Sequence, residues 1–194
     1  MSMFEQVRDV GALIAAMAGG ERPELVFFWG HRPSTCGGPG REVLSQWWKV
    51  RFEVDGVGYS SAEHWMMAEK ARLFGDEAMR AEIIAAPDPA AAKRLGRKVR
   101  GFDHAVWEAR CVEIVTEGNV AKFGQNPELG AFLASTGSGV LVEASPQDRI
   151  WGIGMVASDP RASDPTRWDG RNLLGFALME ARHRLAAAGS GQDG

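Results

Sequence analysis

The chain has 194 residues and a formal net charge of −3, with 45% hydrophobic and 24% charged residues. This composition is typical of a soluble globular protein, and it excludes general electrostatic attraction to nucleic acid or to an anionic membrane. No apolar run approaches the roughly 20 residues that span a bilayer, and the N-terminal stretch lacks the basic start of a secretion signal. The two cysteines, Cys36 and Cys111, are too few for a disulfide framework. We therefore expect a cytoplasmic protein that makes no contact with membranes.

The strand signals lie in the first third of the chain. Residues 1–24 predict a helical extension, because an amphipathic stretch over 3–18 ends at two glycines. Short β-rich runs and an Asp-Gly pair follow, and such a pair is typical of a hairpin turn. The predicted strands are residues 25–29, 48–54 and 57–59, with the turn at Asp55-Gly56. The stretch 31–40 is too rich in Gly and Pro for regular structure.

Helical patterns dominate the rest of the chain, and Asp88 and Asp103 are expected to cap two of these helices. The predicted helices are residues 60–74, 76–86, 89–95, 103–123, 126–137 and 172–188, with a small strand at 140–142. Residues 146–170 are expected to be largely irregular, and the tail 189–194 to be disordered. Few strands followed by many helices indicate a helix-rich α+β fold. We expect one domain over residues 25–188, with short antiparallel strands near the N-terminus packed on a helical core.

Two charges stand out on the predicted helix 60–74. Glu63 and Lys70 are seven residues apart, so they lie within roughly 20° of each other on its apolar face. A carboxylate and an ammonium that point at a core cost several kcal/mol each unless they are paired, hydrated or used. Glu63 also fits a capping box with Ser60, and Lys70 could extend its ammonium out of a shallow interface. The pair is therefore the first candidate for chemistry, with these structural alternatives open.

A second candidate follows the strand at 140–142. Asp148, Trp151, Gly152 and Gly154 fall within seven residues, where glycines permit close approach of a ligand and a tryptophan can stack on it. A tight surface loop pinned by a buried tryptophan would explain the same residues.

Other aromatic and titratable residues give weaker signals. Trp29 and Gly30, at a strand end, could form another stacking wall, whereas a residue such as Trp107 on a long helix more often belongs to the core. The histidines share no metal-ligand spacing, so we expect no metal and no cofactor.

Several motifs, in order, resemble the NADAR family, also called the YbiA-like or DUF1768 family. The first is Ser61-Ala62-Glu63-His64-Trp65 with Ala68-Glu69-Lys70, and the others are the segments 121–129, 148–154 and 170–180. The resemblance covers roughly residues 25–185. One departure is Leu44-Ser45-Gln46-Trp47, where the family has Phe-Ser-Asn-Phe. A second is the insertion 155–168.

The resemblance implies an N-glycosidase that hydrolyses the bond between a ribose C1′ and a nitrogen. Its substrates would be phosphoribosylamino-pyrimidine intermediates of riboflavin synthesis or, alternatively, ADP-ribose on guanine in nucleic acid. It implies catalytic roles for Glu63, Lys70 and Asp148. The implied substrate contacts are Trp29, Gly30, Trp107, Trp151 and Gly152.

Two mechanisms fit these residues, and a different class of function remains. Glu63 could act as general base while Lys70 holds it ionised, or Lys70 could form a Schiff base with C1′. An apolar setting lowers a lysine pKa and a carboxylate raises it, so the sequence leaves this choice open. A non-catalytic module that binds ADP-ribose or a related nucleotide is the alternative from another class.

Overall fold

The computed structural model describes residues 3–32 and 38–190. The chain forms two compact units. One consists of Met1–Ser45 together with Glu128–Gly194, and the other of Gln46–Pro127. Among the described residues, no helix is both long and apolar enough to cross a membrane. The segment 33–37, with Cys36, and the predicted tail beyond 190 lie outside the described residues.

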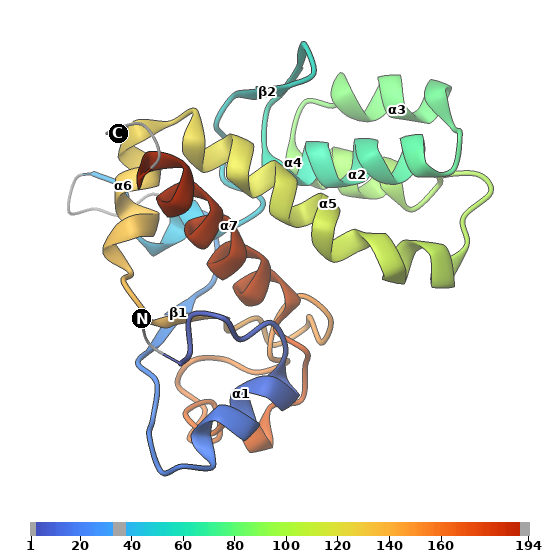
Figure 1. The fold of residues 1–194 in the computed structure, drawn as a ribbon. Coiled ribbons are helices and arrows are strands. Elements are labelled where there is room, and N and C mark those ends of the chain that lie inside the picture. The colour runs from blue at the N-terminus through green and yellow to red at the C-terminus, as the bar shows by residue number, and fades with distance from the viewer. Residues whose placement is uncertain (1–2, 33–37, 191–194) are drawn as a thin grey trace. The chain divides into compact units, whose positions relative to one another are not determined.

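A parallel strand pair contributes to the buried core of the first unit, and Figure 1 labels the first of the two strands, β1. Strand β1 (Leu25–Phe28) pairs with β4 (Val140–Glu143), with Leu25 opposite Val140 and Phe28 opposite Glu143. Helix α7 (Leu173–Ser190) packs on β4, and Gly175 permits this because a Cβ there would lie 2.0 Å from Leu141 O. The remaining elements of this unit are α1 (Val10–Met17), η1 (Arg41–Leu44), α6 (Pro127–Ser135) and η2 (Pro165–Arg167).

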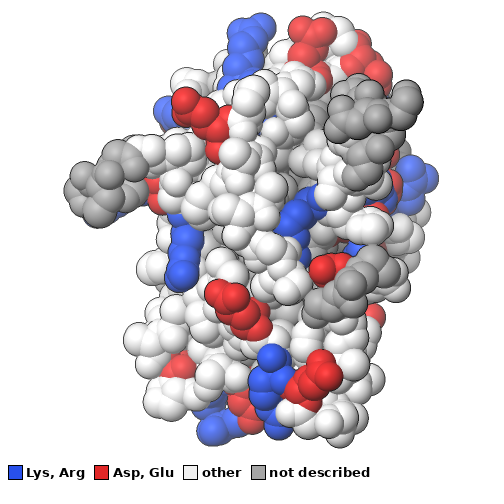
Figure 2. Space-filling view, turned by 60° about the vertical axis from the view of Figure 1, so that its left-hand side comes forward, with Lys and Arg blue, Asp and Glu red and all other residues white. Residues whose placement is uncertain are grey.

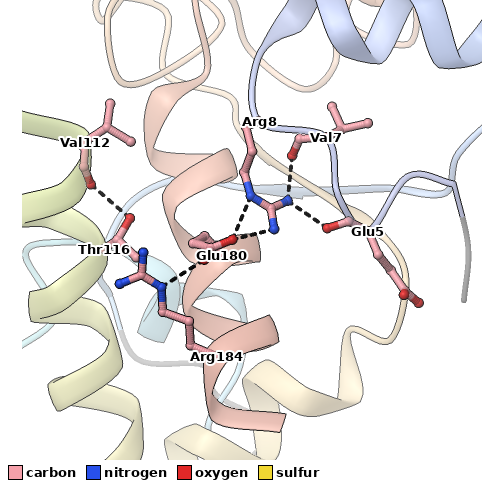
Figure 3. A network of polar contacts seen from close by, with 7 residues as sticks. All are labelled: Glu5, Val7, Arg8, Val112, Thr116, Glu180 and Arg184. Carbon is pink, nitrogen blue, oxygen red and sulfur yellow. Dashed lines mark hydrogen bonds and ion pairs between the residues drawn. The ribbon is translucent and has the colours of Figure 1, made fainter. Parts of the chain in front are cut away.

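An ion-pair network ties the segment before α1 to α7 (Figure 3). The Arg8 guanidinium donates to Glu180 Oε2 at 2.7 Å and to the carbonyls of Glu5 and Val7 at 2.7 and 2.9 Å. Arg184, one turn along α7, donates to the other oxygen of Glu180 at 2.8 Å. Two guanidinium groups on one carboxylate lower the pKa of Glu180 against the opposing effect of its burial, which is the largest single influence. The N-terminal segment is thereby fixed to the helix that covers the strand pair.

Asn172 connects β4 to α7. It is fully buried and has a φ of 53°, a left-handed conformation that Asn tolerates better than most residues. Its Oδ1 accepts the Glu143 N–H at 2.9 Å, and its Nδ2 donates to Leu141 O at 2.9 Å. One side chain therefore satisfies two buried backbone groups where the chain enters the helix.

Asn172→Ala is expected to lower the free energy of unfolding by about 3 kcal/mol, because it leaves both backbone groups unpaired and puts a residue that tolerates the left-handed conformation less well than Asn at this position. Asn172→Gly loses the same two hydrogen bonds but tolerates the left-handed conformation. It should therefore be about 1 kcal/mol more stable than Asn172→Ala. Urea unfolding of the two variants measures both values. A loss below about 0.5 kcal/mol in Asn172→Ala would contradict this assignment.

The second unit packs a hairpin and four helices. Strands β2 (Phe52–Val54) and β3 (Val57–Tyr59) pair in antiparallel fashion. Helix α2 (Ala62–Leu73) contacts α3 (Glu77–Ile84), α4 (Pro89–Gly96) and α5 (His104–Gly124) (Figure 1). Each of the four helices begins at a side-chain cap, and the caps are Ser61, Asp76, Asp88 and Asp103. Because α2 is surrounded by the other helices, a charge on almost any of its faces is buried.

Close approach between these helices depends on glycine. A Cβ at Gly96 would lie 2.1 Å from Met67 Sδ, and one at Gly118 would lie 2.2 Å from Trp65 Cδ1. Trp65 Nε1 also donates to Ile114 O at 2.6 Å, which fixes α2 against α5. The side chains of α2 are therefore held in fixed positions relative to α4 and α5.

The elements confirm the helix-rich α+β class, including the helices predicted behind Asp88 and Asp103. The prediction of antiparallel strands holds for the hairpin and is wrong for β1. That strand pairs in parallel with β4, because the long intervening chain permits the crossover that parallel pairing requires. The first helix begins only at Val10, since the Asp9 side chain accepts the Ala12 N–H and caps it. The last helix extends through Gly189 and Ser190, which were predicted to belong to the tail.

Candidate functional site

Glu63 lies in the first turn of α2 and is 2% exposed. The N-cap of this helix is Ser61, whose Oγ accepts the His64 N–H at 3.4 Å. The alternative of a capping box with Ser60 thus places the cap one residue too early, and the Glu63 N–H donates to Gln46 O at 3.0 Å. Glu63 is therefore a buried carboxylate at the second helical position, and not at the third position that a capping box uses.

His64 takes the place that the capping box assigned to Glu63. Its Nε2 lies 3.1 Å from Ala86 O, which can only accept, so Nε2 carries the proton. Its Nδ1 then accepts from Ser61 Oγ at 2.7 Å. Burial lowers the pKa of His64, in agreement with a neutral ring that makes both contacts. This histidine is a structural part of the helix start.

Lys70 is half-buried on the same face of α2 as Glu63, in an aromatic setting. Its Nζ donates to Gly96 O at 2.9 Å and lies 4.1 Å from the ring centroid of Phe102 and 5.8 Å from that of Trp107. Burial lowers the pKa of Lys70, which answers the question that the sequence left open. One carbonyl and two rings lie around the ammonium and attract it, whereas removal from water favours the neutral amine and lowers the pKa.

The predicted substrate contact Trp107 is thus brought to Lys70. It is half-buried on α5 rather than fully packed into the core. Phe102 joins it, with 43% of its surface exposed and edge contacts to Phe74 and His104 at 5.3 and 6.4 Å. An exposed aromatic surface beside a lysine of lowered pKa can hold a planar group close to an amine.

The other predicted residues belong to the first unit. Trp29 follows β1 and is 62% exposed, and Gly30 after it has a φ of 82°. Asp148 Oδ1 accepts the N–H groups of Ile150 and Trp151 at 2.9 and 2.7 Å, so one of its oxygens shapes the loop. Trp151 is half-buried, and a Cβ at Gly152 would lie 2.7 Å from Glu143 O.

This loop is held against the start of α7. The N–H groups of residues 171–174 donate to carbonyls of residues 149–152 at distances of 2.9 to 3.2 Å. The first N–H groups of α7 are therefore occupied by the loop itself. Asp148 and Gly152 thus each have a structural task, as the alternative of a tight loop required, and their roles toward substrate remain predictions.

Three residues of the second unit were not among the predicted site residues. Gln46 is 7% exposed and contacts Glu63 through its backbone, and Lys122 is fully buried on α5. Phe102 contacts Lys70. The sequence contained a signal for the first two, since Gln46 departs from a family motif and Lys122 lies inside another. Phe102 gave no signal, because a single aromatic residue before a helix is common.

The two units supply an α+β framework in which one helix face presents a buried carboxylate and a half-buried lysine. Residues 27–186, which include parts of both units, match the NADAR domain family, and the chain belongs to this family. The match agrees with the resemblance seen in the motifs.

Relatives with similar sequences or structures support the same assignment. N-glycosidase R617 of Acanthamoeba polyphaga mimivirus is 42% identical over 167 residues, which cover 84% of this chain and 96% of that protein. N-glycosidase YbiA of Escherichia coli (strain K12) is 34% identical over 139 residues, covering 72% and 77%. The NMR structure of E. coli YbiA superposes with a TM-score of 0.68 at 29% identity, covering 88% of this chain and 89% of that one. The chloroplastic riboflavin biosynthesis protein PYRR of Zea mays is 35% identical over 108 residues, covering 54% of this chain and 16% of that protein.

Proposed function

We propose that this protein is an N-glycosidase that hydrolyses the C1′–N bond of a phosphorylated ribosyl compound, with early intermediates of riboflavin synthesis as its substrates. The observation that carries the proposal is the buried Glu63 on the same helix face as the half-buried Lys70. Membership of the NADAR family and two relatives named N-glycosidases support the reaction type. The maize relative named for riboflavin biosynthesis supports the substrate class.

The reaction needs negative charge near C1′ and an activated nucleophile, because cleavage passes through an oxocarbenium-like centre. In the simpler form, Glu63 accepts a proton from the attacking water and passes it to the departing nitrogen. Asp148 is proposed to anchor a sugar hydroxyl or a water molecule. Trp29, Gly30, Trp107, Trp151 and Gly152 are the proposed substrate contacts.

In the second form, Lys70 attacks C1′ itself. Its neutral amine forms a Schiff base with the ring-opened sugar as the bond to the base nitrogen breaks, and water then hydrolyses the imine and returns the free lysine. The lowered pKa of Lys70 supports this form, because only the unprotonated amine is a nucleophile. We therefore propose Lys70 as the nucleophile and Glu63 as the residue that moves the proton.

Glu63→Gln is expected to lower kcat/KM by roughly 10²- to 10⁴-fold, because the amide cannot accept the proton. Product release is measured by chromatography with the riboflavin-pathway amine, NAD, ADP-ribose conjugates and ADP-ribosylated guanine as substrates. Glu69→Gln is the matched control, since Glu69 is a second buried carboxylate of α2 that pairs with Arg72. Near-complete activity in Glu63→Gln would refute both forms of the mechanism.

The same assay separates the alternative functions. Release of ADP-ribose from modified guanine, with the pathway amine untouched, would favour the ADP-ribosyl substrate. On the face shown in Figure 2, Lys and Arg side chains are interspersed with Asp and Glu rather than gathered in one patch. This face therefore offers no broad basic surface to a nucleic acid. Binding of intact ADP-ribose with an affinity unchanged by Glu63→Gln would indicate a non-catalytic module.

A further inference from the structure

Gln46 is bound to the same turn of α2 that carries Glu63. Its carbonyl accepts the Glu63 N–H at 3.0 Å, and it is 7% exposed while Glu63 is 2% exposed. A backbone hydrogen bond of this length brings the two residues into direct contact. The two buried side chains therefore begin from adjacent backbone positions inside one unit.

The orientation of the Gln46 amide follows from its neighbour Asn119. Asn119 Nδ2 donates to Val115 O at 2.8 Å, so its Oδ1 must be the atom that faces Gln46. That oxygen accepts from Gln46 Nε2 at 3.2 Å. The NH₂ of Gln46 is thus directed to α5, and its carbonyl oxygen is directed elsewhere.

This oxygen, Gln46 Oε1, is buried and accepts no hydrogen bond from any residue within 3–32 or 38–190. A buried acceptor left unpaired costs roughly 1–3 kcal/mol, and an apolar side chain of equal size would avoid that cost. The contact to Asn119 explains the NH₂ and not the oxygen. A group with a hydrogen to donate, bound beside Glu63, would satisfy it.

We propose that Gln46 orients the hydrolytic water, by accepting one of its two hydrogens while Glu63 accepts the other; this inference rests on the proposed function. In the form with Lys70 as nucleophile this water hydrolyses the imine, so its oxygen bonds to C1′ and the bond from C1′ to Lys70 Nζ breaks. The proton taken by Glu63 passes to that nitrogen, and the second hydrogen stays on the new hydroxyl. An amide carbonyl can only accept, so it fixes the direction of the water lone pair without competing for the proton.

The experiment compares water with methanol as nucleophile. Methanol has one hydroxyl hydrogen, which Glu63 takes, so methanol gains nothing from Gln46. Gln46→Met is expected to lower kcat for hydrolysis by roughly 10- to 100-fold with KM within about threefold. The ratio of methyl riboside to free sugar in methanol–water mixtures should rise by about the same factor. Loss of a purely structural residue would reduce both products equally.

Two further variants keep the test decisive. Gln46→Glu places a second carboxylate beside Glu63, so the acid limb of kcat/KM should move up by about one pH unit. If Gln46→Met is unstable at the assay temperature, the pH profile of Gln46→Glu still tests the proposal. Thr116→Val is the control, because Thr116 is a buried residue of α5 that donates only to Val112 O, at 2.9 Å (Figure 3).

The outcomes separate the two proposals. An active wild type in which Gln46→Met leaves the product ratio unchanged, or Gln46→Glu leaves the acid limb unmoved, overturns the role of Gln46 alone. A wild type that releases no sugar from any substrate, or a fully active Glu63→Gln, overturns the proposed function and this inference with it.

Discussion

Lys70→Met is expected to abolish release of the ribosyl group, with kcat/KM lowered by roughly 10³-fold or more. The methionine matches the length of the lysine stem and lacks only the amine, the group that lies over the rings of Phe102 and Trp107, so the loss would come from the amine. Lys70→Arg keeps a positive charge but has no nucleophilic amine, and it should be as inactive. Initial rates with the preferred substrate measure both effects.

Borohydride provides the direct measurement of the adduct. Reduction during turnover should attach the ribosyl group to the peptide that contains Lys70, as seen by mass spectrometry. Lys93→Met is the matched control, because Lys93 is also half-buried and lies 5.8 Å from an aromatic ring, that of Trp47. It should retain activity and trapping. An active Lys70→Arg, together with a wild type that gives no trapped adduct, would assign Lys70 to electrostatic support of Glu63 instead.

Much of the fold could be predicted from local patterns in the sequence. The caps Asp88 and Asp103 are visible because a capping side chain binds a backbone N–H three residues later, within the same short stretch. The pairing of β1 with β4 has no such signal, since more than a hundred residues separate the two strands. Asp9 shows how a local rule can also be missed, because its role as a cap divides the amphipathic pattern of 3–18.

For the candidate site too, local features could be predicted from the sequence and long-range contacts could not. Helical periodicity placed Glu63 and Lys70 on one face, which needs only the geometry of α2. The expected cap was Ser60, and the adjacent serine, Ser61, is the N-cap in the structure. What surrounds Lys70 comes from α4, α5 and the loop between them, through Gly96 and Phe102, and no local pattern reports such contacts. The pKa direction of the lysine could therefore be obtained only from the structure.

Lys122 poses the remaining question about charge in the second unit. It lies in a motif of the family, is fully buried on α5, and its Nζ is 4.8 Å from the ring centroid of Phe123. Burial lowers the pKa of Lys122 to about 7, so a substantial fraction of its amines is neutral at physiological pH. A buried lysine with a lowered pKa makes the free energy of unfolding depend on pH.

Lys122→Met is expected to remove a pH dependence of stability on the order of 4 kcal/mol between pH 7 and 10.5. In that window the unfolded chain keeps the lysine proton and the folded protein releases it, so wild-type stability should rise with pH. Below about pH 7 the cost of burying the charge is fully present. The variant should therefore gain most over the wild type at pH 7 and lose this advantage as the pH approaches 10.5. Urea unfolding at several pH values measures the difference, with the exposed Lys98→Met as control. A difference that stays constant with pH would show that Lys122 is charged in the folded protein and compensated there.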